Sequence, residues 1–189
     1  CDSVALPFAE DLFVDPIGEG SALRAWNRCG ELGLVAIFHP SSNPAAPDIE
    51  VEVHSRAIRN LPGSSHAIWS ISLGWLGIVQ AGEPVPRTLR PMDADLLVFS
   101  PLVEGFAPLG LVDKWCPAAA PIEWTQNADE IRLLLRGGGR FAFYLEKPIT
   151  RCTLDGVPHN LDSQGALHFI DTGSTPRATL NIHTADSHV

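Results

Sequence analysis

The chain has 189 residues and a formal net charge of −9, with 13 Lys and Arg against 22 Asp and Glu. Its basic residues are scattered and form no stripe that would displace counterions from phosphates, so we expect no nucleic-acid or membrane partner. Hydrophobic residues make up 45% of the chain and charged residues 19%, which excludes a disordered tail. The longest apolar stretches, such as residues 32–38, are far shorter than the roughly 20 residues of a membrane span.

The first half of the chain shows period-two alternation between turn residues, which predicts half-buried strands. We expect the first two strands to pair as a hairpin across residues 28–31, and a later pair to be joined near Gly74. Pro91 blocks a helix between the last two strands. Residues 55–61 fit one or two helical turns. The predicted strands of this half are 22–27, 32–39, 48–53, 66–72, 75–80, 87–90 and 95–100.

The second half continues the alternation. The run Gly137-Gly138-Gly139 predicts a hairpin turn between its first two strands, and Asp155-Gly156 predicts a second tight turn. The predicted strands of this half are 130–133, 141–146, 151–154 and 177–183.

The fold class follows from this spacing. Sixteen Gly and sixteen Pro divide the chain at the short intervals that many short strands require. The sequence therefore predicts an all-β, antiparallel β-sandwich of roughly ten or more strands. We expect one domain over residues 1–189, with an alternative seam near residues 102–121, where 117–121 reads Pro-Ala-Ala-Ala-Pro.

A search for catalytic groups begins with paired carboxylates, because glycoside hydrolysis needs two. Glu50 with Glu52, and Asp93 with Asp95, each lie two residues apart and would share one face of a strand. We interpret both pairs as a solvated sheet face or edge, where charge discourages aggregation. No Gly-x-Ser-x-Gly elbow is present, and the histidines lack helical metal-ligand spacing. We therefore expect no catalytic residue, no metal and no cofactor in this chain.

The four cysteines form no CxxC pair, which argues against a structural zinc site. We expect reduced thiols and a cytoplasmic setting. One alternative is an N-terminal-cysteine hydrolase, since a cysteine at the first position can act as nucleophile with its own α-amine as base. The cysteines are Cys1, Cys29, Cys116 and Cys152.

Five tryptophans are the remaining candidates for binding, because aromatic faces stack on sugar rings. Trp69 and Trp75 are the ones we expect to line a carbohydrate groove if the chain binds an oligosaccharide. The alternative is core packing or interdomain contact, since each tryptophan lies in an apolar or alternating context. We favour packing.

Two groups of segments resemble the β-domain that follows the catalytic barrel in raffinose synthases, seed imbibition proteins and alkaline α-galactosidases. The resemblance spans roughly residues 11–181, with residues 40–65 poorly matched. His39, where the family has an asparagine, points to a microbial or fungal relative. The first group is 11–16 (Asp-Leu-Phe-Val-Asp-Pro), 20–27 (Gly-Ser-Ala-Leu-Arg-Ala-Trp-Asn) and 33–38, and the second is 88–91, 97–101 and 106–114.

The resemblance implies an upstream (β/α)₈ barrel in the same polypeptide, on which this C-terminal β-domain packs. The family's two catalytic aspartates lie on barrel strands, and no segment here matches their motifs. The whole enzyme would cleave or transfer an α-galactosyl group with retention. We therefore expect a non-catalytic module that stabilises the barrel, with a carbohydrate-binding module as the alternative. The predicted barrel-contact residues are Phe13, Pro16, Trp26 and Asn27.

Overall fold

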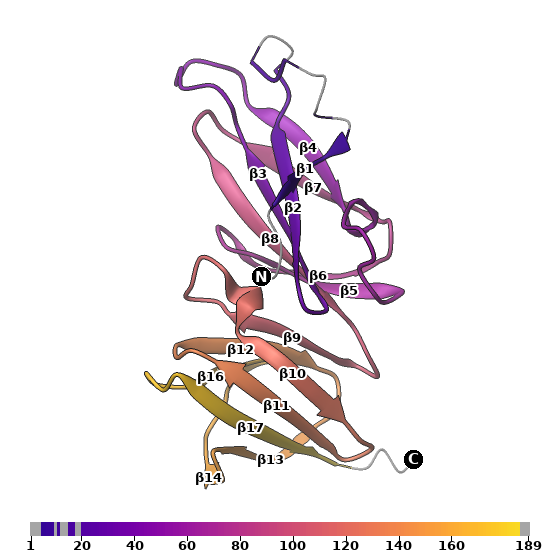
Figure 1. Ribbon diagram of the computed structural model, residues 1–189, viewed down its shortest axis with the longest axis vertical. Helices are drawn as coiled ribbons and strands as arrows, with labels where there is room; N and C mark the ends of the chain where they lie inside the picture. The colour runs from indigo at the N-terminus through magenta and orange to yellow at the C-terminus, as the bar shows by residue number, and fades with distance from the viewer. Residues whose placement is uncertain (1–4, 10, 12–14, 18–19, 186–189) are drawn as a thin grey trace. The chain divides into compact units, whose positions relative to one another are not determined.

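The computed structural model describes residues 5–9, 11, 15–17 and 20–185 and divides the chain into two compact units (Figure 1). Unit 1 ends at Pro101, and unit 2 begins at Leu102. The division falls at the start of the alternative seam near 102–121, and the expectation of one domain over residues 1–189 stays a prediction. No helix in the described part of the chain is long and apolar enough to span a bilayer.

Unit 1 consists of one six-stranded antiparallel sheet and a two-stranded ribbon. The sheet order is β1-β2-β3-β8-β5-β6, and the ribbon pairs β4 with β7. Ile37 and Leu97 of the sheet share one hydrophobic core with Val53 and Leu89 of the ribbon, so the ribbon covers one face of the sheet. The strands are β1 Leu6–Pro7, β2 Leu23–Cys29, β3 Leu32–Phe38, β4 Ile49–His54, β5 Ser65–Ser70, β6 Gly74–Gln80, β7 Pro84–Leu89 and β8 Ala94–Pro101.

Unit 2 is a sandwich of two antiparallel sheets, ordered β10-β11-β17-β13-β14 and β15-β16-β12-β9. Leu133 and Leu180 of the first sheet and Phe141 and Phe143 of the second belong to one buried cluster, which is the core of this unit. The strands are β9 Phe106–Leu111, β10 Pro121–Gln126, β11 Glu130–Arg136, β12 Arg140–Leu145, β13 Ile149–Leu154, β14 Val157–Pro158, β15 Asp162–Gln164, β16 Leu167–Asp171 and β17 Arg177–Thr184.

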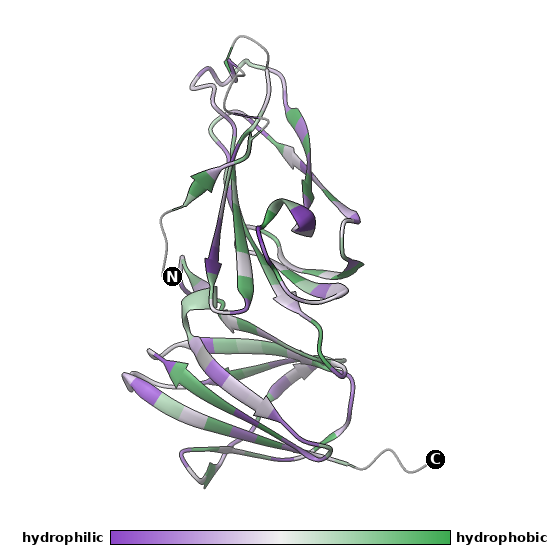
Figure 2. Cartoon of the chain, turned by 45° about the vertical axis from the view of Figure 1, so that its right-hand side comes forward, coloured by the Kyte–Doolittle hydropathy of each residue, from purple (hydrophilic) through white to green (hydrophobic). Residues whose placement is uncertain are grey.

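The all-β prediction is confirmed, because the described residues contain strands and short 3₁₀ turns, such as η2 (Ser55–Ala57) and η3 (Pro117–Ala119), but no α-helix. Alternation predicted β17 correctly, since Ala178, Leu180 and Ile182 are buried while the residues between them are more exposed. It did not predict β9, β10, β15 and β16. Figure 2 shows hydrophobic residues along the strands of both units. The predicted hairpins β2–β3 and β5–β6 also form.

The predicted hairpin turn at Gly137-Gly138-Gly139 is wrong. The chain crosses here from one sheet to the other, because β11 lies between β10 and β17 while β12 lies between β16 and β9. Each strand sends its alternating apolar residues into the same core from opposite sides. Gly138 permits the crossing, since a Cβ there would collide with the backbone of Gly173. The turn at Asp155-Gly156 is confirmed, with φ of 50° and 80° between β13 and β14.

Candidate functional site

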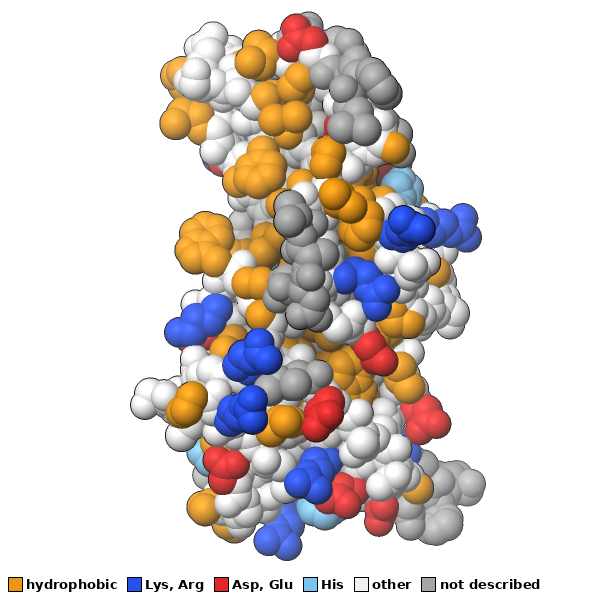
Figure 3. Space-filling model, in the orientation of Figure 1, with side chains coloured by type: hydrophobic (Ala, Val, Ile, Leu, Met, Phe, Trp, Pro, Cys, Tyr) orange, Lys and Arg blue, Asp and Glu red, His pale blue; other side chains and the backbone are white. Residues whose placement is uncertain are grey.

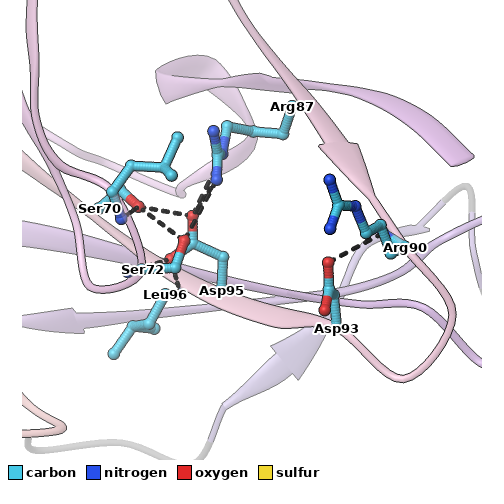
Figure 4. Close-up of polar contacts among 8 residues, drawn as sticks. Ser70, Ser72, Arg87, Arg90, Asp93, Asp95 and Leu96 are labelled. Atoms are coloured by element: carbon cyan, nitrogen blue, oxygen red, sulfur yellow. Dashed lines mark hydrogen bonds and ion pairs between the residues drawn. The ribbon is translucent and has the colours of Figure 1, made fainter. Parts of the chain in front are cut away.

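A buried polar network joins the two layers of unit 1 (Figure 4). On β7, Val85 and Leu89 point into the core, and Arg87 between them therefore also points inward. It meets Asp95 at the start of β8, with Nη2 2.7 Å and Nε 3.1 Å from Oδ2. The side chain of Asp95 is 1% exposed and that of Arg87 10%. The ion pair thus ties the ribbon to the sheet.

Asp95 accepts five hydrogen bonds, which account for both carboxylate oxygens. Besides the two from Arg87, Oδ2 accepts one from Ser70 Oγ at 2.7 Å, and Oδ1 accepts the backbone N–H groups of Ser72 and Leu96 at 3.1 and 2.8 Å. A carboxylate has about four lone-pair positions, so none is left for a substrate. The geometry therefore fits a structural anion rather than a nucleophile or a general acid.

A hollow of about 600 Å³ lies beside this network. Its remaining polar lining includes Asp48, Thr88, Arg90 and Asp93, a mixture of donors and acceptors that can bind a polar ligand. Asp93 is exposed and lies in the turn before β8, where its Oδ2 accepts the Arg90 N–H at 3.0 Å. The carboxylate of Asp93 thus caps its own turn.

The sequence interpretation of the carboxylate pairs is half correct. Glu50 and Glu52 are exposed on the outward face of β4, as expected for a solvated face. Asp95 is buried, so the solvated interpretation is wrong for this residue. Alternation could have predicted this burial, because Asp95 points to the same side of β8 as the core residues Leu97 and Phe99.

The buried histidines have structural partners. His39 donates from Nε2 to the Pro47 carbonyl at 3.1 Å, because its Nδ1 accepts the Ser41 N–H. Burial lowers the pKa of His66, whose Nε2 donates to the Pro62 carbonyl at 2.9 Å. Burial likewise lowers the pKa of His168, which is stacked on Phe143. Within the described ranges no three His, Cys, Asp or Glu side chains are placed to hold a metal ion.

The prediction of reduced thiols is confirmed for Cys152 but not for every cysteine. Cys29 is disulfide-bonded, so the prediction is wrong for this residue. Cys152 is a buried thiol in the core of unit 2, and burial raises its pKa to about 11, which makes it a poor nucleophile. Cys1, the proposed nucleophile of the hydrolase alternative, lies outside the described residues.

Three of the four predicted barrel-contact residues lie in the described part of the chain. Phe13 lies outside the described residues. Pro16 is half-buried in a turn, where its carbonyl accepts the Ser21 N–H. Trp26 packs against the core of unit 1, while its neighbour Asn27 points to the opposite face of β2. No residue of a barrel is present to test these contacts, which stay predictions.

The two predicted stacking residues are brought together. Trp69 on β5 lies directly opposite Trp75 on β6, and both are half-buried. Of the other tryptophans, Trp124 packs on the core of unit 2, and Trp115 is 83% exposed.

Comparison with known proteins agrees with the predicted resemblance. The profile of the family described as raffinose synthase or seed imbibition protein Sip1 matches residues 40–169, more than half of the chain. The match includes residues 40–65, which we expected to be poorly matched. It does not include the strand that contains Trp26 and Asn27.

Curated relatives match over most of the chain. An Arabidopsis thaliana protein named "probable galactinol–sucrose galactosyltransferase 5" is 24% identical over 82% of this chain. The galactinol–sucrose galactosyltransferases of Pisum sativum and Oryza sativa subsp. japonica are each 24% identical, over 86% and 94% of it. The matches cover only 24%, 24% and 27% of these relatives, so the chain spans about a quarter of their length.

Proposed function

Because this chain belongs to the raffinose synthase or seed imbibition protein family, we propose that it is a non-catalytic β-module of a galactosyl-transferring enzyme. The module packs on the catalytic barrel of the same polypeptide and stabilises it. The relatives are named as galactosyltransferases and are about four times as long as this chain, which leaves ample sequence for a barrel.

The observation that carries this proposal is that hydrogen bonds occupy all the acceptor positions of the Asp95 carboxylate. It is the most deeply buried carboxylate among the described residues, and all five of its hydrogen bonds go to groups of unit 1. A retaining glycosidase or transglycosidase needs two carboxyl groups free to attack and to protonate the sugar. The buried Asp95 carboxylate of unit 1 holds the fold together and offers no free oxygen for such chemistry.

Deleting this chain from the gene product that contains it tests the stabilising role. We expect the remainder to melt at a lower temperature and to become less soluble, because an apolar surface loses its cover. A remainder with an unchanged melting curve contradicts the proposal.

Sugar binding is a second candidate, favoured by the direct opposition of Trp69 and Trp75. Titration of the 189-residue chain with raffinose-type galactosides, followed by tryptophan fluorescence, tests it. Saturable quenching that is lost in Trp75→Ala without unfolding supports sugar binding, and an unchanged spectrum rejects it.

A further inference from the structure

The hollow beside the buried polar network is lined by both layers of unit 1. The ribbon contributes residues of β7, and the sheet contributes the β5–β6 turn and the start of β8. Its volume of about 600 Å³ lies within the range of roughly 300–1,000 Å³ that is typical of small-molecule sites. Because the ion pair of Arg87 with Asp95 joins the two layers, the lining is held in place before any ligand binds.

Arg87 has hydrogen-bond donors to spare at this hollow. A guanidinium carries five N–H donors. Nε and Nη2 donate to Asp95 Oδ2, and Nη2 also donates to Ser72 Oγ at 3.3 Å. Nη1 has no hydrogen-bond partner in the described part of the chain, although the side chain is only 10% exposed and lines the hollow. Nη1 is not among the sealed atoms without a partner, so a ligand in the hollow can reach it.

Three exposed charged residues complete the polar lining: Asp48, Arg90 and Asp93. Figure 4 shows the Arg90 side chain extending from the end of β7 on the side where Arg87 and Asp93 lie. Its guanidinium forms no ion pair with another described residue, and Asp93 uses only Oδ2, as the acceptor of the Arg90 N–H. The guanidinium of Arg90 can therefore donate to a ligand, and Asp93 Oδ1 can accept from it.

The lining selects the chemical class of the ligand. Two arginines and three aspartates line the hollow, so a ligand with a net charge would meet repulsion as well as attraction. On the face in view in Figure 3, basic and acidic side chains are likewise interspersed, without a patch of one sign. A hydroxyl group both donates and accepts, so neighbouring hydroxyls can bind a guanidinium and a carboxylate together. Leu73, which is 63% exposed, and Pro86 add apolar lining for C–H groups.

We propose that this hollow binds a neutral sugar. Arg87 Nη1 and the Arg90 guanidinium donate to its hydroxyl oxygens, and the carboxylates of Asp48 and Asp93 accept its hydroxyl protons. The inference goes beyond the stabilising role of the module, which does not depend on it. It also places sugar binding away from the two stacking candidates, since none of the residues that line the hollow is a tryptophan.

An NMR titration of the 189-residue chain with raffinose tests the proposal. We expect saturable shifts of the backbone signals of residues that line the hollow. Arg90→Met should weaken binding about tenfold, because hydrogen bonds from a charged donor are lost. Arg136→Met on β11, also an exposed arginine, is the matched control and should bind like the wild type. Asp48→Asn is a second variant, expected to weaken binding even if Arg90→Met lowers the melting temperature.

A titration without saturable shifts overturns the inference and leaves the stabilising role standing. Binding that is lost in Trp75→Ala but kept in Arg90→Met also overturns it, because the sugar then lies on the tryptophan pair. Saturation by inorganic phosphate but not by raffinose would show that the ligand is an anion and would contradict the neutral class.

Discussion

At the scale of single residues, the main feature is a charge pair inside a small hydrophobic unit. Transferring Arg87 and Asp95 out of water costs free energy, which their attraction offsets only because all the acceptor positions of the carboxylate are occupied. We therefore expect the pair to contribute more to how the ribbon sits on the sheet than to net stability. Removing one partner leaves the other buried and unpaired.

Arg87→Met is expected to lower the free energy of unfolding by about 3–5 kcal/mol, because the buried Asp95 carboxylate loses its counter-charge. Urea denaturation measures the change. Lys114→Met, which breaks the exposed pair of Lys114 with Asp113, is the control and should cost less than about 1 kcal/mol. In the double variant Arg87→Met/Asp95→Leu we expect part of the loss to be recovered; a simple sum of the two single losses would show that the pair is not coupled.

Acid should destabilise the chain through its buried histidines. Burial lowers the pKa of His66 and of His168 below the ordinary value of 6.5, so the folded state binds fewer protons than the unfolded state. Stability is then fully present above about pH 6.5 and falls as the pH drops toward the lowered pKa values. Urea midpoints measured from about pH 7 to pH 5 test this. We expect a smaller slope in His66→Gln, and a wild-type midpoint independent of pH would be inconsistent with neutral buried histidines.

At the scale of elements, close approach of backbones constrains the sandwich of unit 2. Gly110 on β9 has a φ of 96°, and a Cβ there would collide with the carbonyl of Pro117 in η3. The β9–β12 pairing shifts register next to this point, between Ala142 and Phe143. A glycine is thus required for both conformation and space.

Gly110→Ala should destabilise the chain by more than about 2 kcal/mol, because strain at positive φ adds to a clash with rigid backbone. Gly156→Ala, at a φ of 80° with no atom near the added methyl group, is the matched control. Only conformational strain of about 1–2 kcal/mol is expected there. Thermal melts compare the two, and equal losses would mean that η3 does not pack on β9.

Alternation predicted most strands of unit 1 and the hairpins β2–β3 and β5–β6, but it did not predict how the strands of unit 2 pair. The inward residues of β11 and β12 were correctly identified, yet the strands belong to different sheets, since a shared core does not require a shared ladder. The same alternation places Arg87 in phase with the buried Val85 and Leu89 and so indicates that it points inward. Its positive charge would by itself suggest an exposed position.

At the scale of the whole molecule, each unit has a core of its own. The cluster of unit 2 contains residues from Phe106 to Ile182 only, and that of unit 1 from Phe8 to Phe99 only. A unit that buries its own apolar surface has the means to fold alone.

Residues 102–189, expressed without unit 1, should therefore unfold cooperatively with a strand-rich circular dichroism spectrum. Proteolysis or calorimetry measures this directly. A fragment without a cooperative transition would support the single-domain prediction over residues 1–189 instead.

The central claim is that this chain supports galactosyl chemistry without performing it, and catalytic activity tests it most directly. The 189-residue chain, purified and shown to be folded, is incubated with raffinose-type galactosides and with galactinol plus sucrose, and released galactose and transferred galactosyl groups are quantified. We predict no turnover above the buffer control, while the gene product that contains the chain is active. Measurable turnover by the chain alone, abolished by substitution of one of its own carboxylates, would contradict the account.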